Sequence, residues 1–503
     1  MLSPRTAVVY QDPELLSYAA RPPFSPGEHY NEYPLRDEGT HGANPCYAAM
    51  RRFFALAGFD AQNFGSAQWN PLGELICPGD TVAIKPNLVL HYNHTGGPLE
   101  CVVTHASLIR AMVDYVLIAL RGSGAVIIGD APLQSANFEQ VCTLSGLKDV
   151  LAFYQRYAPV SVELIDFRCQ HARMHDRLGV LGVEPAAGDP RGYAAVDFGK
   201  RSMLASTDNR FGDYRVTNYD PEHMLLHHNR VKHEYLIAGS ILHANVVISM
   251  PKMKTHRKVG ITGALKNCVG INGHKDWLPH HTKGSSKQGG DEYAHPSVFK
   301  AAYGTLVESQ DLARSRAAKE LLRVGCGVLH RASEVLAEDP FFEGSWWGND
   351  TLWRTVLDLN RALLYADRGG VLHNQPQRRV FFLTDGIIAG EGEGPVNPDP
   401  KPIGVLLGGC SAAVVDAVMA RVMGFDFRKI PCVREAFHIT ELPLTETLPD
   451  EIDIISNRVD IARMQLQTAG TNFGFTPSRG WQDHIELCPS QLPEASETTN
   501  PVA

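Results

Sequence analysis

Residues 104–132 read "THASLIRAMVDYVLIALRGSGAVIIGDAP", a segment with helical spacing followed at once by an apolar, β-branched run. Thr104 suits a helix N-cap, and Gly122 and Gly124 suit the exit from the helix. The run "TVAIKPNLV" (81–89) precedes this segment, so the order is strand, helix, strand. Such a unit forms a right-handed crossover between parallel strands. The stretch therefore predicts an α/β fold, with a mostly parallel sheet and helices on both faces.

Four further apolar runs extend this pattern: "VSVELIDF" (160–167), "NVVISMPK" (245–252), "RVFFLTDGI" (379–387) and "IGVLLGG" (403–409). Two tracts break the alternation, and we interpret both as insertions into the α/β core. The expected organisation is an N-terminal extension packed on the core (1–74), a first core segment with a polar insertion (75–274, insertion 168–235), a helical and loop insertion (275–377), a second core segment (378–480) and a disordered tail (481–503).

Composition excludes several classes of protein. The chain has 503 residues, of which 44% are apolar and 20% charged, as in ordinary globular proteins. A net charge of -8 argues against a nucleic-acid partner, which requires a basic surface. The N-terminus lacks a signal-peptide pattern, and no run reaches the roughly 18 apolar residues of a membrane span. We therefore expect a cytoplasmic protein.

The ten cysteines form no CxxC motif and no clustered spacing. This distribution argues against a disulfide framework in a chain of this length. It also argues against an intrinsic iron–sulfur cluster, whose ligands are closely spaced cysteines.

Cations are concentrated in the stretch "SMPKMKTHRKVGITGALKNC" (249–268), which follows a predicted buried strand. If the strand continues, Lys252 and Lys254 share one of its faces. We expect Arg257 and Lys258 to lie on the ordinary surface. In an acidic protein, such a local excess of cations indicates an anion site.

Other polar residues fall at the ends of the predicted strands. Lys85 and Asn87 end the first strand, Asp130 ends the second, and Asp385 follows the run "VFFLT". Ligands of parallel sheets bind at the carboxyl edge, where these ends meet. Asp130 equally suits a helix N-cap, and Asp416, within a helical pattern, equally suits a structural salt bridge.

These positions predict an enzyme that acts on an anionic small molecule, such as a phosphorylated, nucleotide-linked or carboxylate compound. The predicted catalytic residues are Asp130, His256, Lys266 and Asp385. The predicted substrate-binding residues are Lys85, Asn87, Lys252, Lys254, Thr262 and Asn267.

Two patterns suggest a divalent metal. The glycine-rich stretch "DGIIAGEGEGP" (385–395) places Glu391 and Glu393 on an adaptable loop, where they could hold a hard cation together with Asp385. A plain flexible turn is the alternative. His223 and His227, four residues apart, would share a helical face as in zinc sites, although the glutamate of HExxH is missing.

The motifs "KPNLV", "GDAP", "ISMPKMKTHRKVGITGALKNCVGIN" and "DGIIAGEGEGP" occur in this order. With them the chain, from Asp80 to Pro431, resembles the family named domain of unknown function 362. Many members of that family carry ferredoxin-like cysteine motifs, which are missing from this sequence. The resemblance also implies a place in surface-polysaccharide or secondary metabolism.

Two other functions fit the same residues. One is a non-catalytic accessory or scaffold protein that binds an anion or a metal, because no complete catalytic triad or nucleotide loop occurs. The other, implied by the resemblance, is a redox enzyme that takes electrons from an external donor.

Overall fold

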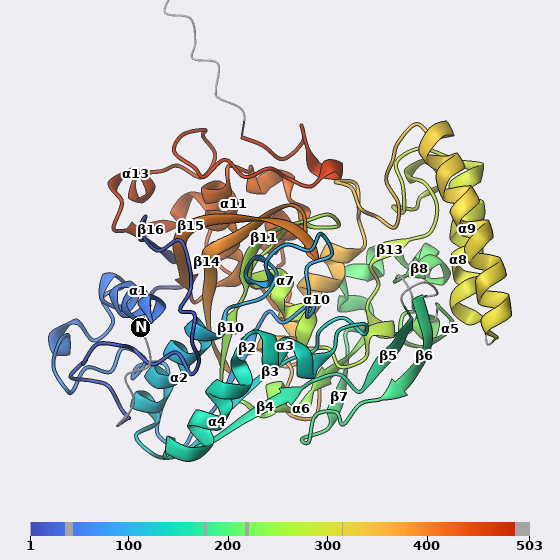
Figure 1. Ribbon diagram of the computed structural model, residues 1–503. Coiled ribbons are helices and arrows are strands. Elements are labelled where there is room, and N and C mark those ends of the chain that lie inside the picture. Colours follow the sequence, from blue (N-terminus) through green and yellow to red (C-terminus); the bar gives the residue numbers. More distant parts are fainter. Residues whose placement is uncertain (1, 36–43, 176–178, 217–220, 314, 488–503) are drawn as a thin grey trace, which may run out of the picture.

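One large sheet forms the centre of the molecule (Figure 1). The computed structural model describes residues 2–35, 44–175, 179–216, 221–313 and 315–487. The order across the sheet is β16 (Asp453–Ser456), β1 (Thr6–Gln11), β15 (Asn397–Gly409), β14 (Arg379–Glu393), β10 (Val246–Met250), β2 (Thr81–Pro86), β3 (Ala125–Asp130) and β4 (Ser161–Asp166). The hairpin β11 (Lys252–His256) and β12 (Gly260–Thr262) joins the sheet beside β14.

The neighbouring strands β14, β10, β2, β3 and β4 run parallel, which confirms the predicted α/β fold. Ser249 on β10 lies opposite Lys85 on β2, and Asp130 on β3 lies opposite Asp166 on β4. β14 and β15 instead form a long antiparallel hairpin. Asp385 therefore lies inside β14 and not beyond a strand end, contrary to the prediction.

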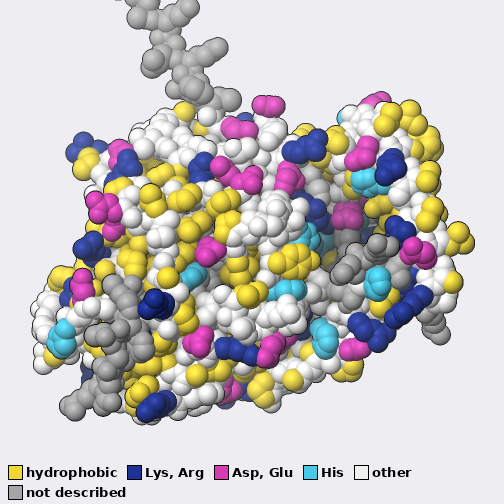
Figure 2. Space-filling model, viewed as in Figure 1, with side chains coloured by type: hydrophobic (Ala, Val, Ile, Leu, Met, Phe, Trp, Pro, Cys, Tyr) yellow, Lys and Arg dark blue, Asp and Glu magenta, His cyan; other side chains and the backbone are white. Residues whose placement is uncertain are grey.

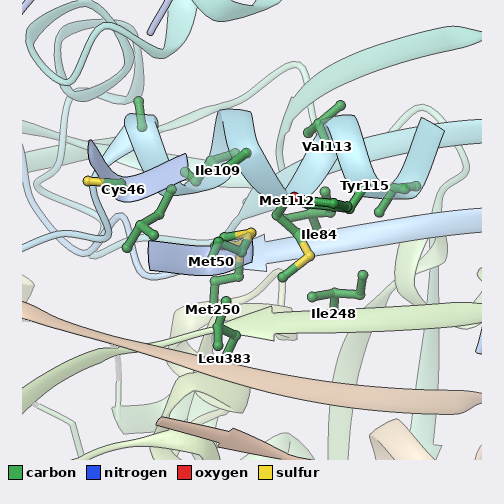
Figure 3. Close-up of a cluster of buried hydrophobic side chains, with 14 of the residues drawn as sticks. Cys46, Met50, Ile84, Ile109, Met112, Val113, Tyr115, Ile248, Met250 and Leu383 are labelled. Carbon is green, nitrogen blue, oxygen red and sulfur yellow. The ribbon is translucent and has the colours of Figure 1, made fainter. Parts of the chain in front are cut away.

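Helices cover both faces of the sheet. α2 (Ala106–Leu120) crosses from β2 to β3, and α1 (Pro45–Leu56) packs on it. Figure 3 shows Met50 and Met112 from these helices near Ile84 and Ile248 of the strands. α10 (Leu352–Tyr365) and α11 (Ala412–Met423) bury the other face.

The N-terminus of α2 differs from the prediction by one residue. His105 is the N-cap, and its side chain accepts the backbone N–H of Ser107. Thr104 Oγ1 instead donates to the carbonyl of Met250 (2.6 Å) and accepts the backbone N–H of Asn87 (2.9 Å). Thr104 thereby ties the start of the helix to the ends of β2 and β10.

The first insertion is built mainly from small antiparallel sheets. β5 (Gln170–His175) pairs with β6 (Gly179–Pro185), and β7 (Tyr193–Asp197) pairs with β9 (Glu234–Ala238). α5 (Pro221–His227) precedes β9, and β8 (Tyr214–Arg215) pairs with β13 (His281–Thr282) of the second insertion. The two insertions are therefore in direct contact.

The second insertion contains the helical hairpin α8 (Val298–Leu312) and α9 (Arg316–Leu336). This hairpin stands at one side of the molecule, and Figure 2 shows a hollow between it and the rest of the protein. α10 also falls within residues 275–377, but it is buried against the sheet and belongs to the core.

Both ends of the chain contribute to the core more than predicted. β1, within the expected N-terminal extension, pairs with β15 and β16 inside the sheet. The predicted disordered tail begins too early, because Trp481 and Ile485 are buried in the core. Residues 488–503 lie outside the described residues.

The remaining elements are short helices: α3 (Phe138–Leu144), α4 (Leu147–Tyr157), α6 (Gly239–His243), α7 (Ala264–Asn267), α12 (Pro431–Ala436) and α13 (Val459–Ala462). Among the described residues, no helix has both the length and the apolar character required to cross a membrane.

Candidate functional site

A cavity of about 330 Å³ opens at the carboxyl ends of β2 and β3. Lys85 and Asp130 line it from these strands, and Lys266 lines it from α7. His256 enters from β11, and His280 enters from the second insertion. The volume is in the range of small-molecule sites, roughly 300–1,000 Å³. Segments that are distant in the sequence thus converge at the edge where ligands of parallel sheets bind.

The polar part of the cavity wall is strongly cationic. Among the described lining residues, Asp130 supplies the one carboxylate. The lining cations are Lys85, Arg257, Lys258, Lys266 and Lys275. Because the chain as a whole has a net charge of -8, this excess of positive charge is local.

A buried ion pair forms one side of the cavity. Lys85 Nζ lies 2.7 Å from Asp130 Oδ1, and both side chains are almost completely buried. The backbone N–H of Leu88 donates to Asp130 Oδ2 (2.7 Å). Lys85 Nζ also donates to the Pro86 carbonyl and to Asn267 Oδ1, both at 2.8 Å. The Lys85 ammonium group is thus engaged within the protein by two hydrogen bonds and one ion pair.

Asn267 connects the parallel strands to one another. Its Nδ2 donates to Ser249 Oγ (2.9 Å) and to the Lys85 carbonyl (3.1 Å). Asn87 Nδ2 donates to Asn267 Oδ1 (3.5 Å). Asn87 and Asn267, both predicted to bind the substrate, line the cavity, and their amides also hold its framework.

Asp416 fixes the helix that carries Lys266 and Asn267. Its carboxylate accepts the backbone N–H groups of Ala264 (2.7 Å) and Leu265 (2.9 Å) at the start of α7. Capping of such unpaired N–H groups defines where a helix begins. Burial raises the pKa of Asp416 to about 7. The structure therefore gives Asp416 a capping role instead of the salt bridge or ligand contact considered from the sequence.

Several polar groups in the wall have no partner. Within the described part of the chain, Lys266 Nζ has no hydrogen-bond acceptor or ion-pair partner. Burial lowers the pKa of Lys266 to about 8. The side chain of Lys266 is half-buried, whereas Thr262 Oγ1 and both amide atoms of Gln134 are buried without a hydrogen-bond partner in the described residues. Buried polar groups are nearly always hydrogen-bonded, so Thr262 and Gln134 indicate a polar ligand.

Two histidines with different tautomers also line the cavity. His256 Nδ1 accepts the backbone N–H of Lys258 (3.0 Å), so its neutral ring carries the proton on Nε2. His280 Nδ1 lies 2.7 Å from the carbonyl of Leu278, to which it can only donate. Burial lowers the pKa of both rings well below the usual value. The remaining ring nitrogens are thus a donor on His256 and an acceptor on His280.

The position of Lys258 differs from the one predicted. The sequence placed it on the surface, whereas it is buried, lines the cavity and lies 3.8 Å from Glu343. Burial lowers the pKa of Lys258 to about 8. Arg257 lines the cavity too, although it is only half-buried.

Lys252 and Asp385 lie outside this cavity, contrary to the prediction of one shared cleft. Lys252 Nζ lies 2.7 Å from Asp385 Oδ2, and neither side chain is exposed. Tyr18 OH donates to Asp385 Oδ1 (2.6 Å), and the backbone N–H of His105 donates to Oδ2 (3.0 Å). The pair thus holds β11, β14 and the N-terminal segment together.

Lys254 is also engaged by the protein itself. Its Nζ donates to Asn87 Oδ1 (3.1 Å) and to the carbonyls of Val102 (2.5 Å) and Pro395 (3.1 Å). Met253 packs in the core on the other side, so Lys252 and Lys254 do share a face as predicted. Lys252 Nζ also has three acceptors, Asp385 Oδ2, Tyr18 OH and the Ile388 carbonyl, so neither lysine has a proton left for a ligand.

Glu391 and Glu393 are not brought together with Asp385. Glu391 Oε2 lies 2.8 Å from Lys401 Nζ and accepts the backbone N–H of Thr476 (2.8 Å). Glu393 accepts the backbone N–H of Arg479 (2.7 Å). The stretch predicted as a metal loop lies mostly in β14, with an irregular register between Gly386 and Ile388, and its glutamates bind the segment before Trp481.

The rings of His223 and His227 lie next to each other, with centroids 5.1 Å apart, but the two side chains have different polar partners. His227 Nδ1 lies 2.7 Å from Glu234 Oε1, and its ring stacks on Trp277. His223 instead lies beside His274 and Asp276. Within the described residues, His223, His274 and Asp276 are the one group of three His, Cys, Asp or Glu side chains whose ligand atoms lie within 4.8 Å of one another.

Sequence reasoning did not assign Lys275, His280 or Gln134 to the site. The histidine-rich stretch "HKDWLPHH" (274–281) carried a signal for the first two, because it follows the cationic motif. Gln134 lies in an ordinary loop after β3, and nothing in the sequence distinguishes it.

Comparisons with known proteins agree with the resemblance noted above. A family model described as "Domain of unknown function (DUF362)" matches residues 82–179 and 182–421. No curated protein matches the chain. A crystal structure of a Thermotoga maritima protein is similar over 71% of this chain and 54% of that one, with 10% identity and a TM-score of 0.27. This chain thus spans about half the length of that protein. Because the family model covers most of the chain, the protein belongs to the DUF362 family.

Proposed function

We propose that this protein is an enzyme whose substrate is an anionic small molecule bound in the cavity at the ends of β2 and β3. The observation that carries the proposal is the excess of cations over carboxylates in the lining, together with Lys266, which has no acceptor among the described residues. A phosphate or carboxylate group would supply acceptors for Lys266 and Thr262. Charge-assisted hydrogen bonds of this kind are among the strongest in proteins.

The rest of the lining favours a substrate with an apolar or ring-shaped body. Apolar side chains also line the cavity, among them Val89, Leu133, Val269 and Leu278. Small-molecule sites commonly combine such an apolar wall with a few polar groups that fix orientation. A phosphorylated, nucleotide-linked or carboxylate compound meets this description.

Lys266 is the proposed proton-transfer group. With its pKa lowered to about 8 by burial, it can exchange a proton near neutral pH, which suits a general acid or base. The Nε2–H of His256 would donate to charge that develops on the substrate, and the Lys85–Asp130 pair would hold Asn267 and α7 in place.

Binding and turnover can be tested with matched lysine variants. Wild type, Lys266→Met and Lys401→Met would be titrated calorimetrically with inorganic phosphate, nucleotide sugars and small carboxylates. Lys401 pairs with Glu391 outside the cavity and is the control. Loss of a charged hydrogen bond costs about 1.5–3 kcal/mol, so Lys266→Met should bind roughly 10- to 150-fold more weakly, while Lys401→Met should match wild type.

Product analysis of the same mixtures separates an enzyme from a binding protein. We expect slow or absent turnover in Lys266→Met under saturating ligand, and turnover like that of wild type in Lys401→Met. Ligands that bind wild type tightly but remain chemically unchanged would favour the non-catalytic accessory role.

A further inference from the structure

A second cluster of functional side chains lies where the two insertions meet. His223 belongs to α5 of the first insertion, His274 is the last residue of the first core segment, and Asp276 belongs to the start of the second insertion. Their potential ligand atoms all lie within 4.8 Å of one another. None of the three residues lines the anion cavity, so the cluster is separate from it.

The separations are close to those of a metal site. His223 Nδ1 and His274 Nδ1 lie 4.0 and 3.9 Å from Asp276 Oδ2. Zinc binds nitrogen and oxygen ligands at about 2.0–2.2 Å, which puts two ligand atoms of a tetrahedral ion about 3.3–3.5 Å apart. The two His–Asp separations would need to shorten by roughly half an ångström, and the two histidine nitrogens, which lie within 4.8 Å of each other, would also need to approach. His223 is only half-buried, so its side chain has room for this shift.

Neighbouring groups hold the cluster in position. The rings of His223 and His274 are stacked, with centroids 4.6 Å apart and planes inclined by 19°. Gln170 Nε2 donates to Asp276 Oδ2 (3.5 Å), and Asn272 Nδ2 donates to the His274 carbonyl (2.6 Å). The contact of Gln170 with the Asp276 carboxylate is of the kind that orients a metal ligand, and such contacts contribute to the affinity of a metal site.

We propose that His223, His274 and Asp276 bind one divalent transition-metal ion, with Zn²⁺ as the best match to two imidazoles and one carboxylate. The ion connects α5 of the first insertion to the segment that begins the second. Its place between two insertions gives it a structural role, because it cross-links parts of the chain that are about 50 residues apart.

The test compares the metal content of the untagged, full-length protein with that of three variants. Each protein would be equilibrated with Zn²⁺, dialysed against metal-free buffer and analysed by mass spectrometry. Wild type should retain one equivalent of Zn²⁺ more than His223→Gln and Asp276→Asn. His227→Gln is the matched control, because His227 is on the same helix but pairs with Glu234, and it should retain as much as wild type.

Stability gives a second readout. Zn²⁺ should raise the unfolding temperature of wild type and His227→Gln but not of His223→Gln, because an ion that binds only the folded state stabilises it. Equal Zn²⁺ content in wild type and in folded His223→Gln would overturn the proposal. If the variants fail to fold, Co²⁺-loaded wild type decides: bands of nitrogen and oxygen coordination support the site, and thiolate charge-transfer bands alone contradict it.

Discussion

Two buried lysine–aspartate pairs have different surroundings in this protein. Lys85–Asp130 lines the cavity, whereas Lys252–Asp385 lies outside it and is enclosed by β11, β14 and Tyr18. Burial of charge is costly unless the charges are paired, so each member depends on the other. The Lys252–Asp385 pair tests this dependence more clearly, because neither of its residues takes part in the proposed chemistry.

Replacement of Lys252 by Met should destabilise the protein by about 3–5 kcal/mol, because it leaves the carboxylate of Asp385 buried without its cation. The measurement is the free energy of unfolding in urea. The double variant Lys252→Met, Asp385→Leu should recover part of this loss. A loss below about 1 kcal/mol in the single variant would show that the pair is not coupled as described.

The raised pKa of Asp416 should make the stability of the protein depend on pH. Its pKa is raised to about 7 in the folded protein, above the value near 3.9 of an unfolded chain. Between these values the folded state binds more protons, so this residue's contribution to stability falls as the pH rises from about 4 to 7.

The stability of wild type relative to Asp416→Asn should therefore decline over this range by an amount on the order of 2–4 kcal/mol. Urea unfolding of both proteins at several pH values measures it. A constant difference between pH 4 and 7 would mean that Asp416 is ionised throughout.

At the scale of elements, the short helix α7 and the turn after it form the wall behind Lys266. Gly270 lies against the ion pair: a Cβ at this position would collide with Asp130 Oδ1 and with the end of the Lys85 side chain. Gly263 lies equally close to the Asp416 carboxylate. These glycines allow the backbone to approach the charged side chains closely.

Gly270→Ala should therefore force Lys85 and Asp130 apart, weaken phosphate binding and cost about 1–3 kcal/mol of stability through overpacking. Gly327→Ala is the control, because Gly327 lies inside α9 with open space around it. This variant should be as stable as wild type or more stable by up to about 1 kcal/mol. Calorimetric titration and urea unfolding check both. Unchanged binding in Gly270→Ala would contradict the role given to the pair.

The strands of the parallel sheet could be predicted because β-branched runs bounded by turn residues are typical of buried strands. The β14–β15 hairpin could not, because its glycines and prolines between 386 and 402 also fit a loop. That error moved Asp385 to a strand end and so into the predicted site. Lys252 was placed in the predicted site for the same reason. Its neighbours follow from its pairing opposite Asp385 on β14, which the sequence does not show.

At the scale of the whole molecule, the cavity is completed by residues that long insertions bring back to the sheet. Lys275 and His280 come from the second insertion, and Ala172, Val180 and Val216 come from the first. The residues that line the site from the sheet can be predicted, because the parallel topology brings the strand ends to one edge. The residues that line the site from the insertions depend on how the insertions fold back onto the sheet, which local sequence spacing does not determine.

The local excess of cations predicts a pH dependence of anion binding. Lys258 and Lys266 have pKa values lowered to about 8 by burial, so they lose charge as the pH rises through this value. Sulfate does not titrate in this range, and its affinity should fall about fivefold between pH 8 and pH 9 for each lysine that is protonated on binding.

Lys266→Arg keeps its charge at both pH values and should show a smaller fall in sulfate affinity. Calorimetric titrations of both proteins measure the two slopes. Equal slopes in wild type and Lys266→Arg would show that Lys266 does not titrate in contact with the anion.

We propose that the cavity at the ends of β2 and β3 holds an anion that Lys266 binds. The most direct measurement is an anomalous difference map from crystals of the protein soaked in selenate, an analogue of sulfate. We predict a selenium peak in the cavity, with oxygen atoms in hydrogen-bond reach of Lys266 Nζ and Thr262 Oγ1, and no such peak in crystals of Lys266→Met. Selenium peaks confined to other surfaces of the wild-type protein would contradict the account.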